Sequence, residues 1–582
     1  MVALAVVLAV LAGFIVRLVD IQVVNADEHI EDSLDRAFAG EQVLYGTRGP
    51  IVDETGQTLA GSILRYDCQL DPLLITQIDA NVLEGSTKAR LWEDVSVDVA
   101  DITGQTPEEV RGIVATALAE NANSRFAYLK KSVSTEQYRE LAELEAPYIV
   151  CVQHPARAYP DGAVAGNLVG FVGSDGAPLE SLEKSQDDCL APTNGERVYQ
   201  QGKDGVVIPG TARETPAADG GSLQLTINRD LQWYLQQLIA EQTQNMGAQQ
   251  GGILVYEVKT GKVRAAAEYP TVDPNDFAAT PQDSRTSSIF LDWFEPGSTF
   301  KALTAATVVD AGGQTPDSRV VASSDETFPN GAKVRDSFRH PANDYTLTGV
   351  LIDSSNVGIS KFSETVSPQT RYDYFQRFGI GQGTASGYPS EQTGLLNPVE
   401  QWGPQGTYNT SFGQAVTTTM PELARAYGAI VNDGVKMPLS IIESCTEPDG
   451  TVVEPELAEP EQVVSPETSA QMRAMLENVF LQAPYAQSVE IPGYRIGGKT
   501  GTGEKTDGNG RYKQGVYYTT MVGFAPAENP EYVVVVTLDE PTKVTSSAAN
   551  ATAFQKAMTQ VLKTYRVMPS TTAPELLAKF GQ

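Results

Sequence analysis

The sequence is poor in the residues that build metal centres. Its 582 residues include only four cysteines and three histidines. They contain no Cys-x-x-Cys pair and no two histidines at helical spacing. Zinc and other transition-metal sites need several such side chains close together. We therefore expect no metal site and no cofactor.

Positive charge is also scarce. The chain has 42 lysines and arginines against 73 aspartates and glutamates, which gives a net charge of -31. A strongly acidic protein repels phosphate backbones and anionic lipid headgroups, so we exclude nucleic acid and other polyanions as partners. The hydrophobic content of 41% is high enough for folded cores, and the length allows roughly three or four domains.

A long apolar stretch opens the sequence. Residues 1–16 are entirely apolar or small, and the run continues to residue 24 with few polar interruptions. Crossing a membrane takes about 20 such residues. We interpret residues 1–24 as a single-pass transmembrane anchor in the cell membrane, with a cleavable signal peptide as the alternative. On either interpretation the rest is extracytoplasmic, where Cys151 and Cys189 are a candidate disulfide and free buried thiols are the alternative.

The composition changes in the middle of the chain. Glycine, proline, aspartate and alanine crowd residues 205–221, which is typical of a linker between domains. Before it, residues 25–215 mix short strands with helices, and helices are expected over 107–119 and 135–145. We interpret residues 25–215 as an elongated α+β pedestal or dimerisation-type domain.

Residues 216–567 are expected to form a second domain, in which a mixed sheet packs against helices. Residues 568–582 are expected to form a loose tail. Apolar and alternating runs predict strands and helices at both ends of the second domain. The expected strands are 223–227, 252–258, 263–268, 517–524 and 532–538, and the expected helices begin near Leu231 and Phe554.

Three short motifs follow one another in the second domain. Each pattern alone is common, and the chain contains two decoys, Ser181–Lys184 and Lys259–Gly261. Context separates them, because the decoys lie in a polar stretch and at a hairpin turn. The motifs are Ser298-x-x-Lys301, Ser354-Ser355-Asn356 and Lys499-Thr500-Gly501-Thr502.

Ser298 is the candidate nucleophile. It follows a Pro-Gly turn at the start of an apolar helix expected over residues 299–308. Residues three apart on a helix share a face, so Lys301 would stand beside the Ser298 hydroxyl. A hydroxyl is inert without a base, and a lysine can be that base if burial and a second cation lower its pKa.

Glycines surround the third motif. Gly497 and Gly498 precede Lys499, and Gly503 follows Thr502. Glycine in an edge strand lets another backbone approach closely. The pattern therefore favours a strand that a peptide substrate can join.

The three motifs together resemble the signature of serine β-lactamases and penicillin-binding proteins. Further segments resemble the class B penicillin-binding proteins in the same order, so the resemblance covers most of residues 1–567. These segments are 48–60, 157–162, 273–275, 355–358, 411–414 and 522–526. The family implies a mixed α/β transpeptidase domain, with a five-stranded antiparallel sheet between helices, after a pedestal domain and an N-terminal membrane helix. Ser355 stands where β-lactamases have aspartate, which favours cell-wall synthesis over drug hydrolysis.

The resemblance assigns a catalytic role to residues of each motif. Ser298 would attack the penultimate D-Ala carbonyl of a stem peptide and form an acyl-enzyme. Lys301 would take its proton, and Lys499 would supply the cation that keeps Lys301 neutral. Ser354 would relay a proton to the departing D-Ala, and Asn356 would orient Lys301 and the substrate amide.

Other motif residues would bind the stem peptide or a β-lactam. Thr500 and Thr502 would hold the terminal carboxylate, with Ser355 and Gly501 in the same binding site. The backbone N–H groups of Ser298 and Thr502 would form the oxyanion hole, where each donor contributes about 3 kcal/mol in other enzymes. A β-lactam resembles D-Ala-D-Ala and would acylate the same serine.

The family also implies partners. They are peptidoglycan stem peptides, β-lactams, the membrane, a membrane-embedded glycan polymerase and the division or elongation machinery, and the overall pattern resembles division-type members. No glycosyltransferase segment precedes Ser222, so the chain is not expected to polymerise glycan. A non-catalytic β-lactam sensor or scaffold of the same fold is the alternative function.

Two other enzyme classes compete with this interpretation. Gly493–Thr500 fits the P-loop pattern of nucleotide-binding proteins, but the glycine-rich residues 501–510 are poor helix formers, and a P-loop must open a helix. A histidine-dependent serine hydrolase would have to use His340, which we expect to be a surface or structural residue. No Gly-x-Ser-x-Gly motif supports that class.

Overall fold

The computed structural model describes residues 11–15, 17, 19, 40–200, 207–507 and 511–581. The predicted membrane anchor over residues 1–24 falls mostly outside them. Within the described part, no helix has the length and apolar character that a membrane span requires. The chain divides into two compact units, each made of several segments. The first unit contains residues 1–49, 62–156 and 191–220, and the second contains residues 50–61, 157–190 and 221–582.

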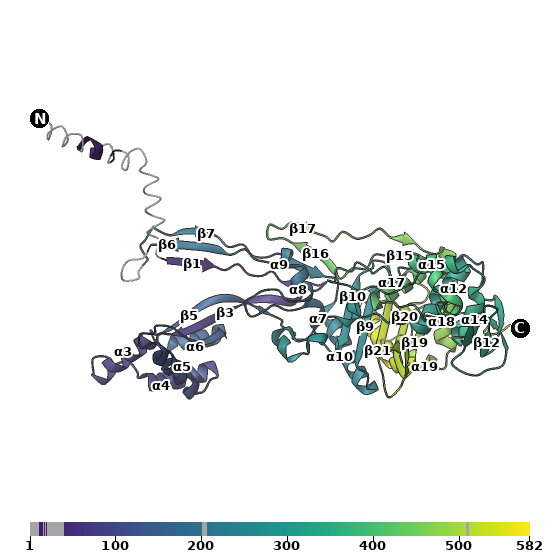
Figure 1. The fold of residues 1–582 in the computed structure, drawn as a ribbon, viewed down its shortest axis with the longest axis horizontal. Coiled ribbons are helices and arrows are strands. Elements are labelled where there is room, and N and C mark those ends of the chain that lie inside the picture. The colour runs from purple at the N-terminus through teal and green to yellow at the C-terminus, as the bar shows by residue number, and fades with distance from the viewer. Residues whose placement is uncertain are drawn as a thin grey trace. The chain divides into compact units, whose positions relative to one another are not determined.

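The first unit contains a helical module packed on a sheet (Figure 1). Strand β3 (Thr58–Leu70), whose first residues belong to the second unit, pairs with β4 and β5 in the first unit. Its side chains alternate, and Tyr66, Cys68 and Leu70 are buried against the helices. Both predicted helices are present and start with a capping box. The elements are β4 (Ala127–Val133), β5 (Ile149–Ala158), α3 (Pro72–Leu83), α4 (Trp92–Thr103), α5 (Pro107–Glu120) and α6 (Thr135–Glu143), with a separate sheet of β1 (Gly40–Leu44), β6 (Gly195–Tyr199) and β7 (Arg213–Thr215).

All four cysteines form disulfides, but the predicted Cys151–Cys189 pair is wrong. Cys151 on β5 bonds to Cys68 on the neighbouring strand β3. Cys189 bonds to Cys445, which lies on β16 (Ile442–Thr446), over a sequence separation of 256 residues. Each disulfide therefore closes one unit on itself.

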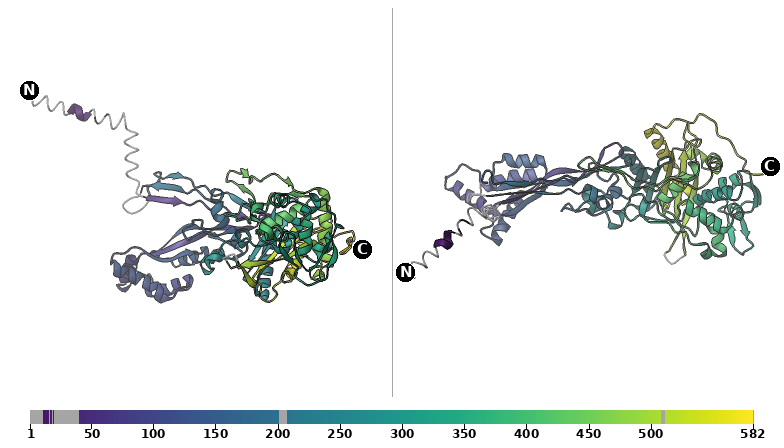
Figure 2. Two further views of the ribbon diagram at one scale, coloured as in Figure 1. Left: turned by 45° about the vertical axis from the view of Figure 1, so that its right-hand side comes forward. Right: turned by 90° about the horizontal axis from the view of Figure 1, so that it is seen from above.

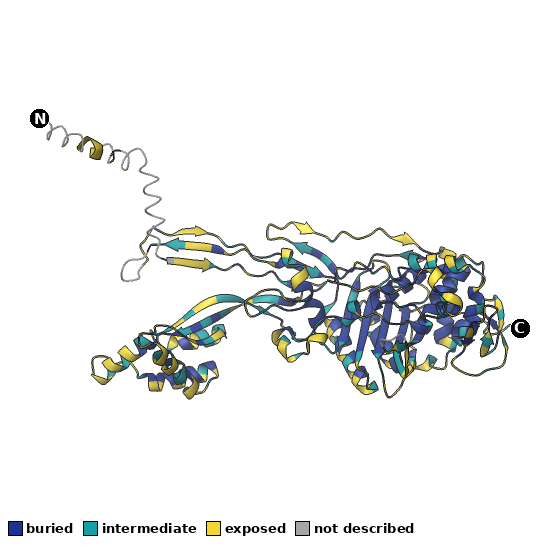
Figure 3. Ribbon diagram, in the orientation of Figure 1, coloured by how far each residue is buried: buried dark blue, intermediate teal, exposed yellow. Residues whose placement is uncertain are grey.

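A five-stranded antiparallel sheet forms the centre of the second unit, as predicted. Its strand order is β10-β9-β21-β20-β19, which leaves β10 and β19 at the edges. Strands β9, β10 and β21, the first half of β19 and the second half of β20 are mostly buried (Figure 3), because helices cover both faces. Their bounds are β9 (Gln250–Glu257), β10 (Val263–Tyr269), β19 (Gly497–Thr506), β20 (Tyr512–Ala525) and β21 (Tyr532–Asp539).

Helices lie on both sides of this sheet (Figure 1). On one side, α10 (Arg229–Met246) and α20 (Ala551–Thr564) contact each other and the sheet. On the other side lie α12 (Lys301–Asp310), α17 (Met420–Val431) and α18 (Pro466–Gln482). The apolar residues whose spacing predicted α10 and α20 form the buried face of each helix.

Shorter elements connect these layers. The predicted strand at 223–227 is present as β8, but it pairs with β2 and β16 in another sheet. The short elements are β2 (Ile51–Val52), α7 (Gly166–Val169), α8 (Ser181–Ser185), α9 (Asp187–Leu190), β8 (Ser222–Leu225), η2 (Pro274–Ala279), η3 (Gln282–Ser284), α11 (Ser288–Leu291), η4 (Gly297–Phe300), β11 (Arg319–Ala322), β12 (Asp325–Thr327), β13 (Lys333–Arg335), β14 (Asn343–Thr346), α13 (Leu347–Ile352), α14 (Asn356–Ser363), α15 (Pro368–Arg377), η5 (Val399–Gln401), α16 (Gly403–Asn409), β15 (Val435–Lys436), β17 (Val452–Val453), β18 (Glu461–Gln462), α19 (Ala486–Val489) and η6 (Ser547–Asn550).

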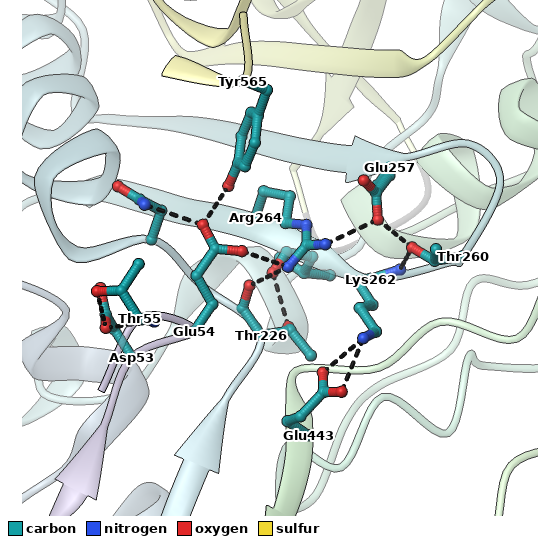
Figure 4. A network of polar contacts seen from close by, with 12 residues as sticks. Asp53, Glu54, Thr55, Thr226, Glu257, Thr260, Lys262, Arg264, Glu443 and Tyr565 are labelled. Carbon is teal, nitrogen blue, oxygen red and sulfur yellow. Dashed lines mark hydrogen bonds and ion pairs between the residues drawn. The ribbon is translucent and has the colours of Figure 1, made fainter. Parts of the chain in front are cut away.

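A partly buried polar network joins the hairpin at residue 54 to the rest of the second unit (Figure 4). Arg264 on β10 forms ion pairs with Glu54 at 2.5 Å and with Glu257 at 2.9 Å. Glu54 also accepts hydrogen bonds from Asn228 and from the hydroxyl of Tyr565, each at 2.9 Å. A shielded charge is tolerated when it is paired, and the Arg264 guanidinium has two carboxylate partners, although its Nε has no hydrogen-bond partner among the described residues.

The tail expected to be loose is hydrogen-bonded to the rest of the second unit. Ser570 donates its backbone N–H to Gly493 and accepts from the backbone N–H of Arg495, each at 2.9 Å. Further along, Leu577 donates its backbone N–H to the buried side chain of Asn478 at 3.0 Å. The prediction was wrong because these partners lie far away in the sequence and carry no local signal.

Candidate functional site

Ser298 lies on the short 3-10 helix η4, which leads directly into α12. Gly297 has a φ of 53°, in the left-handed region that favours glycine, and donates its N–H to Gly413 at 3.0 Å. This turn delivers Ser298 to the helix start with a partly exposed side chain. The three-residue spacing brings the Lys301 Nζ to 2.8 Å from the Ser298 Oγ, as the helical pattern predicted.

Glycines allow strand β19 to approach this turn. A Cβ on Gly501 would lie 2.4 Å from the carbonyl oxygen of Pro296, and one on Gly503 would lie 2.1 Å from that of Glu295. Both distances are shorter than any real Cβ contact. These two glycines therefore allow close contact between β19 and the turn before Ser298, which we call the nucleophile turn. The sequence analysis had instead related the glycines of this segment to the approach of a peptide substrate.

The hydroxyl of Ser354 lies between two lysines. Its Oγ is 3.1 Å from the Nζ of Lys301 and 3.0 Å from the Nζ of Lys499. The Ser354 carbonyl also accepts from Lys301 at 2.6 Å. Ser354 has a φ of 56°, which an L-residue rarely adopts. The structure thus connects Ser298, Lys301, Ser354 and Lys499 through one continuous chain of hydrogen bonds.

Both lysines of this chain are buried, with 0% of Lys301 and 1% of Lys499 exposed. Burial lowers the pKa of Lys499 to about 7. Burial and then the charge of Lys499 lower the pKa of Lys301 well below its usual value, against a weaker opposing effect of Asp336. Two buried amines this close disfavour the state in which both are protonated, so the pair holds one proton more readily than two.

Ser355 does not occupy the predicted substrate position. Its side chain is 1% exposed and caps α14, accepting from the Gly358 N–H at 2.8 Å. The same hydroxyl donates to Asp336 at 2.7 Å. Both hydrogen-bonding functions of Ser355 are therefore used within the protein, and its role here is to hold the loop.

Asn356 is partly exposed beside this loop, and no hydrogen bond joins its side chain to the predicted partner Lys301. Its side-chain amide donates to the carbonyl of Arg335 at 2.8 Å. The hydrogen bonds recorded for the Lys301 amine go to Ser298 and Ser354. The Ser354 carbonyl and hydroxyl therefore hold the Lys301 amine from the loop side.

Asp336 is a residue of this site that the sequence analysis did not identify. Its carboxylate accepts from the Asn356 N–H at 2.6 Å, the Val357 N–H at 2.9 Å and the Ser355 hydroxyl. A carboxylate on the first N–H groups of a helix satisfies donors that have no partner within the helix. Asp336 follows β13 and lies 20 residues before Asn356, so no local pattern connects it to the second motif.

His340 supports Asp336 and is structural, as expected. Its Nε2 lies 2.8 Å from the Asp336 carboxylate, and its Nδ1 lies 2.7 Å from the carbonyl of Pro341. Both partners are acceptors, and the side-chain amide of Asn343 lies 3.5 Å from Nδ1. Burial lowers the pKa of His340, but the hydrogen bonds to Asp336 and Pro341 outweigh it and leave the pKa raised.

The remaining predicted residues lie along β19. Thr500 is 7% exposed, Gly501 is buried and Thr502 is partly exposed. The Thr502 hydroxyl accepts from the Ser547 N–H at 3.3 Å. The structure therefore places this segment directly beside Ser298, through the contact between Gly297 and the Thr502 backbone.

The P-loop alternative is excluded by the same strand. Residues 497–506 form β19, which pairs antiparallel with β20, and no helix opens after Thr500. A phosphate-binding loop needs a helix N-terminus at that point. Both decoys also lie elsewhere: the buried Ser181 hydroxyl donates to Asn167, and Lys259 donates to Asn432.

Comparison with known proteins identifies the family. The penicillin-binding protein transpeptidase domain matches residues 251–559, and the penicillin-binding protein dimerisation domain matches residues 43–225. The chain belongs to the class B penicillin-binding proteins, which confirms the resemblance found in the sequence.

Individual relatives agree with the family match over most of their length. Penicillin-binding protein PbpB of Mycolicibacterium smegmatis is 34% identical over 87% of this chain and 80% of its own. Peptidoglycan D,D-transpeptidase FtsI of Escherichia coli K12 is 30% identical over 97% and 91%. The crystal structure of penicillin-binding protein 3 from Mycobacterium tuberculosis with aztreonam superposes with a TM-score of 0.70 at 28% identity, covering 92% and 99%.

The Asp336 contacts predict a stability effect. We expect Asp336→Asn to lower the free energy of unfolding by about 1–3 kcal/mol, because an amide replaces one acceptor oxygen by a donor that faces N–H groups. Urea denaturation of the purified protein measures the change. Asp325→Asn, on an exposed side chain, is the matched control and should change little. Equal stabilities for the two variants would show that Asp336 does not hold the loop.

Proposed function

We propose that the protein is a peptidoglycan DD-transpeptidase that cross-links stem peptides through an acyl-enzyme on Ser298, and that β-lactams acylate the same residue. The observation that carries this proposal is the hydrogen-bond chain from Ser298 through Lys301 and Ser354 to Lys499. Relatives named as peptidoglycan D,D-transpeptidases and a solved relative complexed with aztreonam support it.

In the acylation step, neutral Lys301 takes the proton of the Ser298 hydroxyl as the Oγ attacks the penultimate D-Ala carbonyl. The bond between that carbonyl and the last D-Ala breaks. Ser354 lies between both amines and passes a proton to the departing amine. An amine of a neighbouring stem then attacks the ester, which closes the cross-link and returns the proton to Ser298.

Groups on β19 and at the helix start bind the substrate in this proposal. The backbone N–H groups of Ser298 and Thr502 stabilise the oxyanion. Thr500 and Thr502 hold the terminal carboxylate beside the charged Lys499, and Gly501 keeps the strand close to the turn. Asn356 contacts the substrate amide. The edge position of β19 supports addition of the stem peptide as a further strand.

We also propose the chain organisation expected from the sequence. Residues 1–24 anchor the protein in the membrane, residues 25–215 form a pedestal, residues 216–567 form the transpeptidase domain, and residues 568–582 form a tail. Two disulfides support an extracytoplasmic location. A membrane glycan polymerase and the division machinery are the proposed protein partners, on the resemblance of the sequence to division-type members of the family.

The nucleophile is tested by mass. After incubation with penicillin, the wild-type protein should gain one adduct, and Ser298→Ala should gain none, because the attacking oxygen is absent. Intact-protein mass spectrometry measures this, with the decoy variant Ser181→Ala as the control that keeps the adduct. An adduct on Ser298→Ala would refute the assignment.

A turnover assay separates the enzyme from a β-lactam sensor, which acylates without turnover. The wild type should turn over a stem-peptide thioester, and Ser298→Ala should not.

The two lysines predict a pH profile. Acylation should fall as the pH drops through the lowered pKa of Lys301, since only the neutral amine accepts a proton, and it should fall again when Lys499 loses its proton. Lys499→Met removes the neighbouring cation, which should raise the pKa of Lys301 and move the acid limb up by about one pH unit.

Acylation rates with a fluorescent penicillin between pH 5 and 10, roughly the range over which these groups titrate, give both limbs. Lys259→Met, the decoy lysine, is the control and should keep the wild-type midpoint. An unmoved acid limb in Lys499→Met would mean that Lys499 does not act on Lys301 by charge.

The anchor has its own test. In cells that express the full chain, the protein should sediment with membranes and resist high-salt extraction, because the apolar run is buried in lipid. Removal of residues 1–24 should release it. A full chain that remains soluble would contradict the anchor.

A further inference from the structure

Ser354 is held at the end of a very short helix. Helix α13 (Leu347–Ile352) ends at Asp353, directly before Ser354. The left-handed backbone of Ser354 is costly for an L-residue, and such a conformation persists only when surrounding contacts impose it. A six-residue helix has little stability of its own. The contacts that fix α13 therefore determine where the Ser354 hydroxyl lies between the two lysines.

The C-terminal segment supplies contacts at the start of α13. We call residues 575–581 the strap. The hydroxyl of Thr346, the N-cap of α13, donates to the strap carbonyl of Ala578 at 2.6 Å, and the Thr346 N–H donates to that of Lys579 at 3.2 Å. Phe580 forms an antiparallel bridge with Tyr345, and their rings lie 5.0 Å apart. In the right-hand view of Figure 2, the yellow C-terminal chain follows the outer edge of the second unit to the end labelled C.

Gly349 on α13 is shaped to receive the strap. A Cβ at this position would lie 1.8 Å from the carbonyl oxygen of Lys579 and 2.7 Å from its carbonyl carbon. No side chain fits there unless the strap moves away. The closeness of the two backbones shows that the strap is part of the packed structure of this helix.

The strap also reaches the other end of α13 through an ion pair. The Nζ of Lys579 lies 2.5 Å from Oδ1 of Asp353, and the Tyr345 hydroxyl donates to Oδ2 at 2.8 Å. The strap residue Lys579 thus holds one carboxylate oxygen of Asp353. Tyr345, on which the strap packs, holds the other. The pair is largely shielded, with 31% of the Lys579 side chain and 14% of that of Asp353 exposed.

The strap has an independent attachment on α18. The buried side-chain amide of Asn478 donates to the Glu575 carbonyl at 2.9 Å and accepts from the Leu577 N–H at 3.0 Å. Gln482, one turn later, donates to the Leu577 carbonyl at 3.0 Å. Because α18 packs on β19, the strap connects α13 to the helix that supports the third motif.

We propose that the strap is a positioning element of the active site, and that Lys579 is its positioning residue for Ser354. The Lys579–Asp353 pair and the backbone contacts at Thr346 hold α13 at both ends, so that the Ser354 hydroxyl remains within reach of both Lys301 and Lys499. The inference rests on the proposed acylation of Ser298 and adds a segment that contributes no group to the reaction itself.

The first test removes the charge. Lys579→Met should lower the acylation rate constant for a fluorescent penicillin by about fivefold, with the dissociation constant of the initial complex unchanged. Lys579→Arg should restore at least half of the rate, because it keeps the cation near Asp353. Lys262→Met is the matched control, since Lys262 forms a similar ion pair with Glu443 at 2.7 Å and 32% exposure. It should acylate at the wild-type rate.

The second test displaces the strap from α13 without changing the sequence of the strap. Gly349→Ala should lower the acylation rate at least as much as Lys579→Met, and the double variant should be no slower than Gly349→Ala alone. Such non-additivity shows that both changes act through one contact. All rates are measured at a temperature where circular dichroism shows each variant to be fully folded.

The outcomes are distinguishable. A folded Lys579→Met that acylates at the wild-type rate would overturn the inference, even if Gly349→Ala fails to fold. Losses that multiply in the double variant, or a failure of Lys579→Arg to restore the rate, would also overturn it. If wild-type protein gains no adduct at Ser298, the proposed function fails instead.

Discussion

Two buried lysines share one serine hydroxyl, and the rest of the catalytic unit is arranged around that contact. Lys301 and Lys499 are both inaccessible to solvent, and each Nζ lies about 3 Å from the Ser354 Oγ. Burying two amines side by side disfavours the doubly protonated state. Burying both amines therefore lowers the stability of the fold. It also keeps one amine neutral beside Ser298, which the proposed function requires.

The fold brings this contact about by joining segments that lie far apart in the chain. Helix α12 carries Lys301, the short helices α13 and α14 flank Ser354, and the edge strand β19 carries Lys499. Close backbone contact makes the junction possible, because Gly501 and Gly503 let β19 lie directly on the nucleophile turn. Side chains at those two positions would push the second lysine away from the first.

Two supports outside the motifs hold the middle segment in place. Asp336 binds the start of α14 from one side, and His340 lies 2.8 Å from its carboxylate. The strap holds α13 from the other side, through Thr346 and Lys579. Strained functional loops need such over-determination, and here it is built from polar contacts that span long distances in the sequence.

The sequence by itself determined the local features. The pairing of Ser298 with Lys301 follows from helical spacing, and the apolar runs of β9, β10, β20 and β21 identify buried strands, because both signals depend on residues a few positions apart. Only the tertiary structure decided the rest. It set the partners of Cys68 and Cys445, the hydrogen bonds of Ser355 and Asp336 that hold the loop, and the backbone contact of the strap with Gly349. Each of these depends on a partner that no local pattern specifies, since chain folding alone brings such residues together.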